Sequence, residues 1–318
     1  MQKPVFDVLV IGAGPVGIYG AYLAKEKGLN VLLIEATETL GGQPLNLYPV
    51  KDIHDYPGFV NIKSMDLVKK LVEQLNHLKV EYKLKTTLKS FSHENNVFNC
   101  VLSDNTEIVS NNIIVAIGNG AFAPNLLDIP GAKDNKNIHY LVTSYEQYQN
   151  KSVVILGGGD SAVDWANNIS TNTNAKVTIV HRRTEFRANG VNVEQLTKNK
   201  VNIILNCDCV EIKNDNELVL LNKTTNQNQT IKFDYLIVQY GQKLEFTLPS
   251  WTKAIKINQA NKILVDQNNQ TNIKNIYAVG NIVGYVNRPN MTITGHGECA
   301  NAINDILAKK RNYENLQK

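Results

Sequence analysis

Three glycines and one glutamate, at fixed spacing, are the first residues of this chain that could do chemistry. Gly12, Gly14 and Gly17 follow the apolar run Val5 to Ile11, and Glu35 comes 35 − 12 = 23 residues after the first glycine. In such a set, the first glycine allows a tight turn, the second lets the backbone approach a pyrophosphate, and the third lets a helix pack against a strand. The spacing predicts a dinucleotide-binding loop.

The charge of Glu35 limits which nucleotide the first loop can bind. A carboxylate accepts hydrogen bonds from the hydroxyls of an adenosine ribose and repels a 2′-phosphate, so the site suits FAD or NAD. Pro15 begins the helix that we expect to run to about Lys27. A second apolar strand, Val31 to Ile34, delivers Glu35 and completes a strand–helix–strand unit.

The same plan returns later in the chain. The apolar strand Ser152 to Leu156 leads into a second glycine loop, which is followed by a helix and by the strand Lys176 to Val180. The residues of this loop that we expect to contact a second nucleotide are Gly157, Gly159, Asp160, Ser161 and Ala162.

A cluster of cations stands where the second unit should carry its acid. Position 157 + 23 = 180 is Val180, and the residues after it include His181, Arg182, Arg183 and Arg187. Guanidinium groups grip phosphate through paired hydrogen bonds, so the ligand expected here is NADPH, held by its 2′-phosphate. A solvated basic loop without a ligand is the alternative reading.

The repeated unit predicts the architecture. We expect an α/β protein with two Rossmann-like, three-layer ββα domains, the NADPH domain being inserted into a discontinuous FAD domain. Because the strand Ile276 to Gly280 and the helix from Gly295 to about Lys310 do not start a third unit, they should return to the first domain. The expected FAD domain is residues 1–118 with 247–318, and the NADPH domain is residues 119–246.

Composition excludes several classes of function. The chain has 318 residues, of which 43% are hydrophobic and 19% charged, and its net charge is +4. It has no run of basic residues typical of nucleic-acid binding, no apolar stretch of about 20 residues that would span a membrane, and no signal peptide. We therefore expect a cytoplasmic protein that contacts neither nucleic acid nor membrane.

The four cysteines carry no recognisable redox or metal pattern. Cys100, Cys207, Cys209 and Cys299 form neither a Cys-x-x-Cys pair nor a zinc site, so we expect no metal and no dithiol. Hydride transfer from NADPH to FAD depends on stacking and alignment. We therefore nominate no catalytic general base.

Longer motifs resemble a known family. Gly41-Gly42-Gln43, Gly118-Asn119-Gly120-Ala121-Phe122, GGGDSAVDW from Gly157 and HRRTEFRA from His181 are similar to the thioredoxin-reductase-like flavoproteins, and among these to the bacterial ferredoxin–NADP reductases. The resemblance covers residues 5 to about 310. It implies that Gln43, Tyr48 and Phe122 lie against the flavin or its ribityl chain and that Asp160 and Ser161 begin the NADPH pyrophosphate loop. Ordinary core aromatics are the alternative interpretation of Tyr48 and Phe122. Leu88 is also placed among the FAD contacts.

Three features depart from the family pattern. Gly280-Asn281 replaces a Gly-Asp pair near the ribityl chain, and the Asn281 amide should still accept a hydroxyl proton. The chain stops at Lys318, where the family usually continues with a tail over the flavin. His296 stands where an aromatic residue is frequent; it is either a simple exposed histidine or an imidazolium that could stabilise reduced flavin.

The electron acceptor is inferred from what the chain lacks. Thioredoxin reductases carry two cysteines where this chain has Tyr140 and Thr143, and relatives that reduce small disulfides have a cysteine where it has Val16. The resemblance therefore implies an external acidic carrier, ferredoxin or flavodoxin, and a homodimeric enzyme. The alternatives are an NADPH diaphorase, oxidase or quinone reductase, and a flavin-bound redox sensor without turnover.

Overall fold

Two compact units make up the chain. The computed structural model describes residues 3–120, 122–244 and 248–316. One unit comprises Met1–Ala121 and Phe246–Lys318, and the other comprises Phe122–Glu245. No described helix is both long and apolar enough to cross a membrane.

A parallel sheet forms the centre of the first unit. Its strands are β5 (Glu81–Lys83), β2 (Val31–Ile34), β1 (Val5–Ile11), β8 (Glu107–Val115) and β19 (Ile276–Ala278), in that spatial order. The apolar runs fit this place, since central parallel strands are covered on both faces. Strand β1 lies between β2 and β8, so its carboxyl end opens where the strand order reverses.

An antiparallel extension leaves the same sheet through the first half of β8. Strand β8 pairs with β7 (Val97–Leu102), and β7 pairs with β6 (Leu88–Glu94). Asn95 and Asn96 join the last two strands at φ of 50° and 63°, which are the backbone angles that a tight hairpin turn requires.

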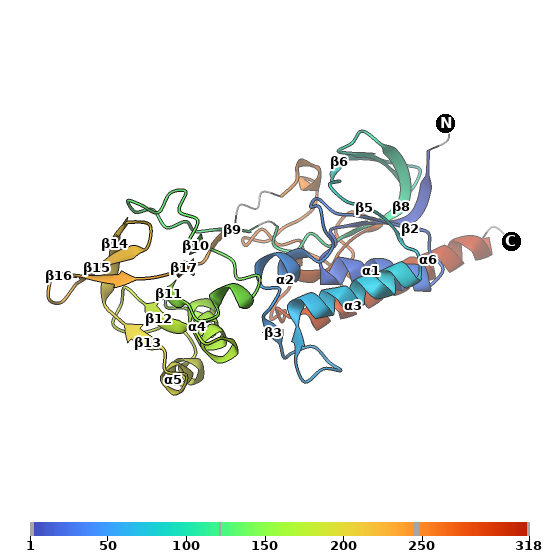
Figure 1. The fold of residues 1–318 in the computed structure, drawn as a ribbon. Helices are drawn as coiled ribbons and strands as arrows, with labels where there is room; N and C mark the ends of the chain where they lie inside the picture. Colours follow the sequence, from blue (N-terminus) through green and yellow to red (C-terminus); the bar gives the residue numbers. More distant parts are fainter. Residues whose placement is uncertain (1–2, 121, 245–247, 317–318) are drawn as a thin grey trace. The chain divides into compact units, whose positions relative to one another are not determined.

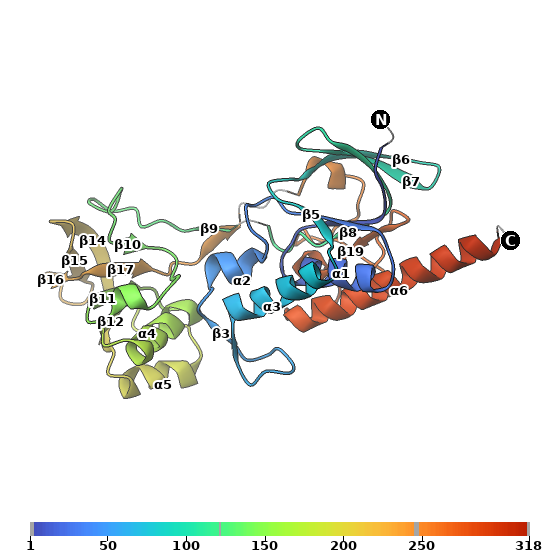
Figure 2. The ribbon, with the colours of Figure 1, turned by 45° about the vertical axis from the view of Figure 1, so that its right-hand side comes forward.

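Three helices cover one face of the first unit's parallel sheet, and the antiparallel extension packs on the other face. Helices α1 (Pro15–Glu26), α3 (Ser64–His77) and α6 (Thr292–Leu316) lie side by side under the sheet (Figure 1), as the turned view also shows (Figure 2). Their buried side chains pack on the same face as Val8 and Val10 of β1. Helix α6 begins three residues before Gly295, where the sequence predicted its start, and it extends beyond the predicted end at Lys310.

Short elements complete the first unit. Helix α2 (Gly42–Leu47) follows β2, and β3 (Asp52–Ile53) pairs with β4 (Ile62–Lys63) before α3. The 3-10 turns η2 (Ser250–Thr252) and η3 (Gly280–Ile282) precede and follow the return of the chain into the sheet.

The second unit is built around another parallel sheet. Its strand order is β10 (Ile138–His139), β17 (Tyr235–Val238), β11 (Ser152–Leu156), β12 (Lys176–Val180) and β13 (Asn202–Ile204). Strand β11 lies between β12 and β17 as β1 lies between β2 and β8, so the second glycine loop also starts at a reversal of strand order.

Helices and a separate antiparallel sheet flank the second unit's parallel strands. The helices are α4 (Asp160–Asn172) and α5 (Gly190–Lys198), and the antiparallel strands are β14 (Cys207–Lys213), β15 (Glu217–Asn222) and β16 (Gln227–Lys232). Apolar side chains of β15 and of the parallel strands share one core. The predicted three-layer ββα fold class is therefore confirmed in both units.

Two short strands and a 3-10 turn remain. Strands β9 (Phe122–Pro124) and β18 (Gln242–Leu244) pair antiparallel at the two ends of the second unit's chain segment, and η1 (Glu146–Tyr148) precedes β11. The side chain of Phe122 lies outside the part that the structure describes.

Candidate functional site

Close backbone packing defines the first glycine loop. Gly12 has φ +100°, and a Cβ there would stand 2.7 Å from the carbonyl oxygen of Ala116, just beyond β8. A Cβ at Gly17 would overlap the carbonyl oxygen of Gly12. The two glycines thus allow β1, α1 and β8 to meet closely, as their spacing predicts.

The middle glycine, by contrast, faces open space. Gly14 caps α1 without a side-chain hydrogen bond, at φ −70° and ψ 176°, and no heavy atom lies within 4 Å of the position of an added Cβ. Pro15 occupies the first turn of the helix, where a missing N–H costs nothing. The remaining N–H groups of that turn and the helix dipole form a cradle suited to a phosphate.

Glu35 is hydrogen-bonded to the main chain of the first loop. The side chain is 9% exposed, and one carboxylate oxygen accepts the N–H of Ala13 at 2.7 Å. The other oxygen accepts the N–H and the hydroxyl of Thr37, each at 2.9 Å. The negative charge is therefore fixed at the end of β2, beside the loop, as an FAD or NAD ribose site requires.

The second loop repeats this geometry with small changes. Gly157 has φ +146°, and a Cβ there would stand 2.6 Å from the carbonyl oxygen of Gln239, just beyond β17. Gly159 caps α4 at φ −96° without a side-chain bond, and Ala162, fully buried, takes the place of the third glycine. Asp160 accepts the N–H of Asn189 at 2.9 Å.

His181 lies directly on this loop. Its ring would overlap a Cβ at Gly158, and it stacks on Phe186 with 5.6 Å between ring centroids. Burial lowers the pKa of His181, and Arg183 and Arg182 lower it further. Its Nε2 is buried without a hydrogen-bond partner among the described residues. An orphaned polar atom beside an open helix terminus fits a site that a ligand completes.

Three arginines lie close enough to His181 to lower its pKa, and one of them, Arg187, contacts the second glycine loop. Arg182, Arg183 and Arg187 are exposed, and the N–H of Arg187 donates to the carbonyl of Gly158 at 2.8 Å. The Arg187 guanidinium lies 3.3 Å from the Cβ position of Gly159. Ser161, exposed in the first turn of α4, faces solvent at the same end. The residues present fit a nucleotide with an additional phosphate.

The other residues predicted to contact FAD lie in separate parts of the first unit. The Gln43 amide donates to the Gly120 carbonyl at 3.5 Å, and Tyr48 ends α2, with its pKa raised by burial and then by Asp55. A Cβ added at Gly42 would lie 2.8 Å from Cα of Gly14, so α2 begins in close contact with the first loop.

The Leu88 side chain is 4% exposed and belongs to the core beneath β6 and β7. Any contact with a cofactor would therefore come from its main chain. Phe122, whose side chain is outside the described part, stays a prediction.

Both interpretations of His296, as an imidazolium and as an exposed histidine, are wrong. The side chain is 5% exposed, its ring stacks on Tyr19 at 4.3 Å between centroids, and burial lowers its pKa to about 4. Its Nδ1 lies 3.3 Å from the Tyr56 hydroxyl and its Nε2 lies 3.3 Å from the Pro15 carbonyl oxygen. A neutral imidazole therefore holds the start of α6 against the start of α1.

Sequence reasoning missed a polar cluster next to Asn281. Arg288 and Glu298 form a buried ion pair, and Arg288 also donates to the Asn281 side-chain oxygen at 3.4 Å. The replacement of the family's aspartate by Asn281 was the available signal, because the loss of a buried acid calls for a search for the cations around it.

No cysteine is arranged for disulfide chemistry. All four are free, and burial raises the pKa of Cys100 to about 12 and that of Cys209 to about 11. Thiols with raised pKa values are poor nucleophiles. Within the described residues, no group of three or more histidine, cysteine or acidic side chains could hold a metal ion.

Two matched glycine loops of opposite charge, each in its own ββα unit, define a flavoprotein oxidoreductase with two nucleotide sites. The family model described as pyridine nucleotide-disulphide oxidoreductase matches residues 6–303. A protein of Malacoplasma penetrans named ferredoxin–NADP reductase is 37% identical over 97% of this chain and 98% of its own length. One of the same name from Streptococcus pneumoniae strain D39 is 34% identical over 96% and 95%.

The solved thioredoxin reductase of Lactococcus lactis matches with a TM-score of 0.71 and 26% identity, over 95% of this chain and 98% of its own. The chain thus belongs to the pyridine nucleotide-disulphide oxidoreductase family, together with these ferredoxin–NADP reductases. The resemblance found in the sequence is confirmed, and the chain is an FAD-dependent oxidoreductase of pyridine nucleotides.

Proposed function

We propose that this enzyme is a ferredoxin–NADP reductase that passes electrons from NADPH, through FAD, to ferredoxin or flavodoxin. When bound, FAD would accept two electrons from NADPH and release them one at a time. The first unit holds FAD and the second holds NADPH. The relatives at 37% and 34% identity carry the name of this activity.

The observation that carries the proposal is the opposite charge at two loops of matched backbone. Glu35 fixes a carboxylate beside the first loop, where it accepts ribose hydroxyls and disfavours a 2′-phosphate. Arg182 and Arg183 stand at the corresponding place in the second unit, where they bind that phosphate. One loop therefore selects FAD and the other selects NADPH over NADH.

The chain's own residues bind and orient the two nucleotides without moving a proton. His181, which lies on the second loop, and His296, which contacts the Pro15 carbonyl at the start of α1, both have pKa values lowered mainly by burial. Neither His181 nor His296 is placed as a general base. Alignment within the sites supplies the rate enhancement, because hydride transfer needs reacting atoms in contact.

The acceptor is an external protein, because the chain offers no thiol relay. Tyr140 and Thr143 replace the two cysteines of thioredoxin reductases, and the Tyr140 hydroxyl instead accepts the N–H of Leu127 at 3.1 Å. The net charge of +4 favours association with an acidic carrier. Ferredoxin and flavodoxin are acidic carriers of this kind, and each accepts single electrons.

The assembly and location are part of the proposal. A homodimer follows from the family resemblance, and sedimentation equilibrium of the holoenzyme tests it. A cytoplasmic location agrees with four free cysteines, since oxidising compartments favour disulfides.

NADPH-driven turnover with a panel of acceptors tests the proposed function. The purified holoenzyme is supplied with NADPH and, in parallel, with ferredoxin, flavodoxin, thioredoxin, a quinone or oxygen alone. We expect rapid reduction of ferredoxin or flavodoxin and none of thioredoxin. Turnover with only quinone or oxygen would make the enzyme a diaphorase or oxidase, and failure of NADPH to reduce the flavin would make it a redox sensor.

A further inference from the structure

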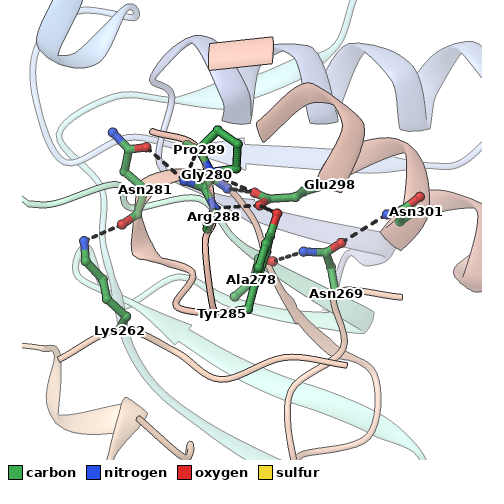
Figure 3. A network of polar contacts seen from close by, with 10 residues as sticks. All are labelled: Lys262, Asn269, Ala278, Gly280, Asn281, Tyr285, Arg288, Pro289, Glu298 and Asn301. Carbon is green, nitrogen blue, oxygen red and sulfur yellow. Dashed lines mark hydrogen bonds and ion pairs between the residues drawn. The ribbon is translucent and has the colours of Figure 1, made fainter. Parts of the chain in front are cut away.

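A buried ion pair between helix α6 and the segment that precedes it also contacts the turn after β19 (Figure 3). Arg288 and Glu298 are 6% and 4% exposed, and two guanidinium nitrogens donate to the carboxylate at 2.6 and 2.9 Å. The carboxylate also accepts the Gly280 N–H at 2.7 Å and the Tyr285 hydroxyl at 3.1 Å. Glu298 is thus fully engaged, and its charge cancels that of Arg288.

The third nitrogen of the Arg288 guanidinium sets the orientation of the Asn281 side-chain amide. Nη1 of Arg288 donates to Oδ1 of Asn281 at 3.4 Å and to the carbonyl of Pro289 at 3.2 Å. With its oxygen turned toward a cation, Asn281 is left with its NH₂ group as the free end of the amide. An aspartate here, as in the family, could only accept. The site of this chain therefore presents a donor where its family presents a negative acceptor, and this donor role replaces the acceptor role that the sequence suggested for the Asn281 amide.

A second cation reaches the same turn from another segment. The Lys262 ammonium donates to the main-chain oxygen of Asn281 and to the side-chain oxygen of Asn119 (the former bond is drawn in Figure 3). Asn119 lies beyond β8 and Asn281 beyond β19, and these two strands are paired neighbours. Lys262 therefore bridges the carboxyl ends of two strands, at the edge of the sheet where ligands bind in this class of fold.

The Lys262 ammonium has no acidic partner in the described part of the chain. Both of its acceptors are neutral, and across residues 3–120, 122–244 and 248–316 no carboxylate forms an ion pair with it. Burial and the nearby Arg288 lower the pKa of Lys262, while the two hydrogen bonds that its ammonium donates favour the charged form. Because Arg288 and Glu298 cancel, the cluster carries one net positive charge.

We propose that Lys262, together with the neutral Asn281, stabilises reduced FAD relative to oxidised FAD and so raises the midpoint potential of the bound cofactor. The inference rests on the proposed function, which places FAD at this edge of the first unit. Reduction adds negative charge to the flavin, and a positive charge held in a partly buried site favours the more negative form. Lys262 thus acts as a residue that tunes the electron carrier for its acceptor.

The midpoint potential of the bound FAD, measured by equilibration with redox dyes, tests the proposal. Lys262→Met should weaken the preference for reduced over oxidised FAD about tenfold, which is about 30 mV toward negative potential for a two-electron couple. Lys262→Arg keeps the charge and should retain most of the wild-type potential. Lys256→Met removes an exposed lysine from the same segment and should leave the potential unchanged.

A second variant keeps the test independent of the folding of Lys262→Met. Asn281→Asp restores a carboxylate between the two cations and should also shift the potential to more negative values. An unshifted or more positive potential in both Lys262→Met and Asn281→Asp, with FAD bound, would overturn the inference and leave the proposed function standing. A wild-type protein that binds no FAD would instead overturn the proposed function itself.

Discussion

The two glycine loops share one backbone and differ in charge. In each, a glycine with positive φ lies against the carbonyl oxygen just beyond a neighbouring strand, Ala116 for Gly12 and Gln239 for Gly157. In each, a glycine without a side-chain cap opens the helix terminus, Gly14 in one case and Gly159 in the other. The backbone thus builds the same phosphate cradle twice.

What differs is the residue that the second strand of each unit delivers. Strand β2 delivers Glu35, whose carboxylate is bonded to its loop, and β12 delivers His181 and the arginines that follow it. The backbone sets where a nucleotide lies, whereas the side chains at the end of one strand set which nucleotide is preferred. Selectivity can therefore be exchanged or removed without rebuilding the fold.

The largest effect is expected at the third position of the first loop. Gly17→Ala makes this loop resemble the second, which has Ala162 there, but the new Cβ overlaps the carbonyl of Gly12 and lies 3.2 Å from Cβ of Ala116. We expect the free energy of unfolding to fall by about 4 kcal/mol, the upper end of overpacking effects, with loss of FAD. Urea unfolding measures it.

The reciprocal change is the matched control for this steric difference. Ala162→Gly removes one methyl group from α4 and should cost only about 1 kcal/mol, mainly through helix propensity. Equal destabilisation by the two substitutions would show that the loops do not differ in packing as described.

The next largest effect should remove the cofactor selectivity of the second loop. Arg182→Ala combined with Arg183→Ala should lower kcat/KM for NADPH by about 30-fold to 700-fold, which corresponds to about 2–4 kcal/mol of charged hydrogen bonds. NADH, which lacks the phosphate, should be affected little. Steady-state kinetics with both nucleotides measures the change, and an equal loss with NADH would contradict the assignment.

The histidine beside the first loop predicts a pH dependence of stability. Between pH 6.5 and 4 the unfolded chain binds a proton at His296 that the folded chain does not bind, because burial lowers the folded pKa to about 4. The free energy of unfolding should therefore decrease by about 2–3 kcal/mol as the pH is lowered from 6.5 to 4.

Chemical unfolding at several pH values measures the slope, and His296→Gln should flatten it. His77→Gln, at an exposed end of α3, is the control and should preserve the wild-type slope. An unchanged slope in the His296 variant would contradict the burial argument.

The smallest effect should come from Glu35→Gln. The amide keeps one oxygen and turns an NH₂ group toward either the Ala13 N–H or the Thr37 N–H, so one donor loses its partner. We expect a loss of about 1–2 kcal/mol in unfolding free energy and a lower FAD content after purification. Absorbance of the released flavin per protein measures the content, and full retention would remove Glu35 as a ribose anchor.

The sequence predicted the parts of the fold whose signals are local. The strands β1, β2, β11 and β12 were predicted at their observed bounds, because apolar runs end in glycines or charged residues there. The predicted start of α6 was three residues late, since the helix begins with Thr292, Ile293 and Thr294, whose residue types do not mark a helix start. Gly295 packs against Val16 of α1.

The electrostatics of the site depended on distant contacts. His296 is neutral because Tyr19 and Tyr56, from two other segments, bury its ring. Lys262 lies 262 − 119 = 143 residues from Asn119, and nothing in its own segment indicates that they meet. A spacing rule finds a glycine loop but does not find a charge whose partners come from several strands.

Anaerobic stopped-flow reduction of the purified yellow protein by NADPH and by NADH tests most directly that two loops of one backbone select two nucleotides. The account predicts that NADPH bleaches the flavin at least about 30 times more efficiently than NADH, as the charged hydrogen bonds to one phosphate imply. Equal rates with the two nucleotides, or no bleaching by either, would contradict it.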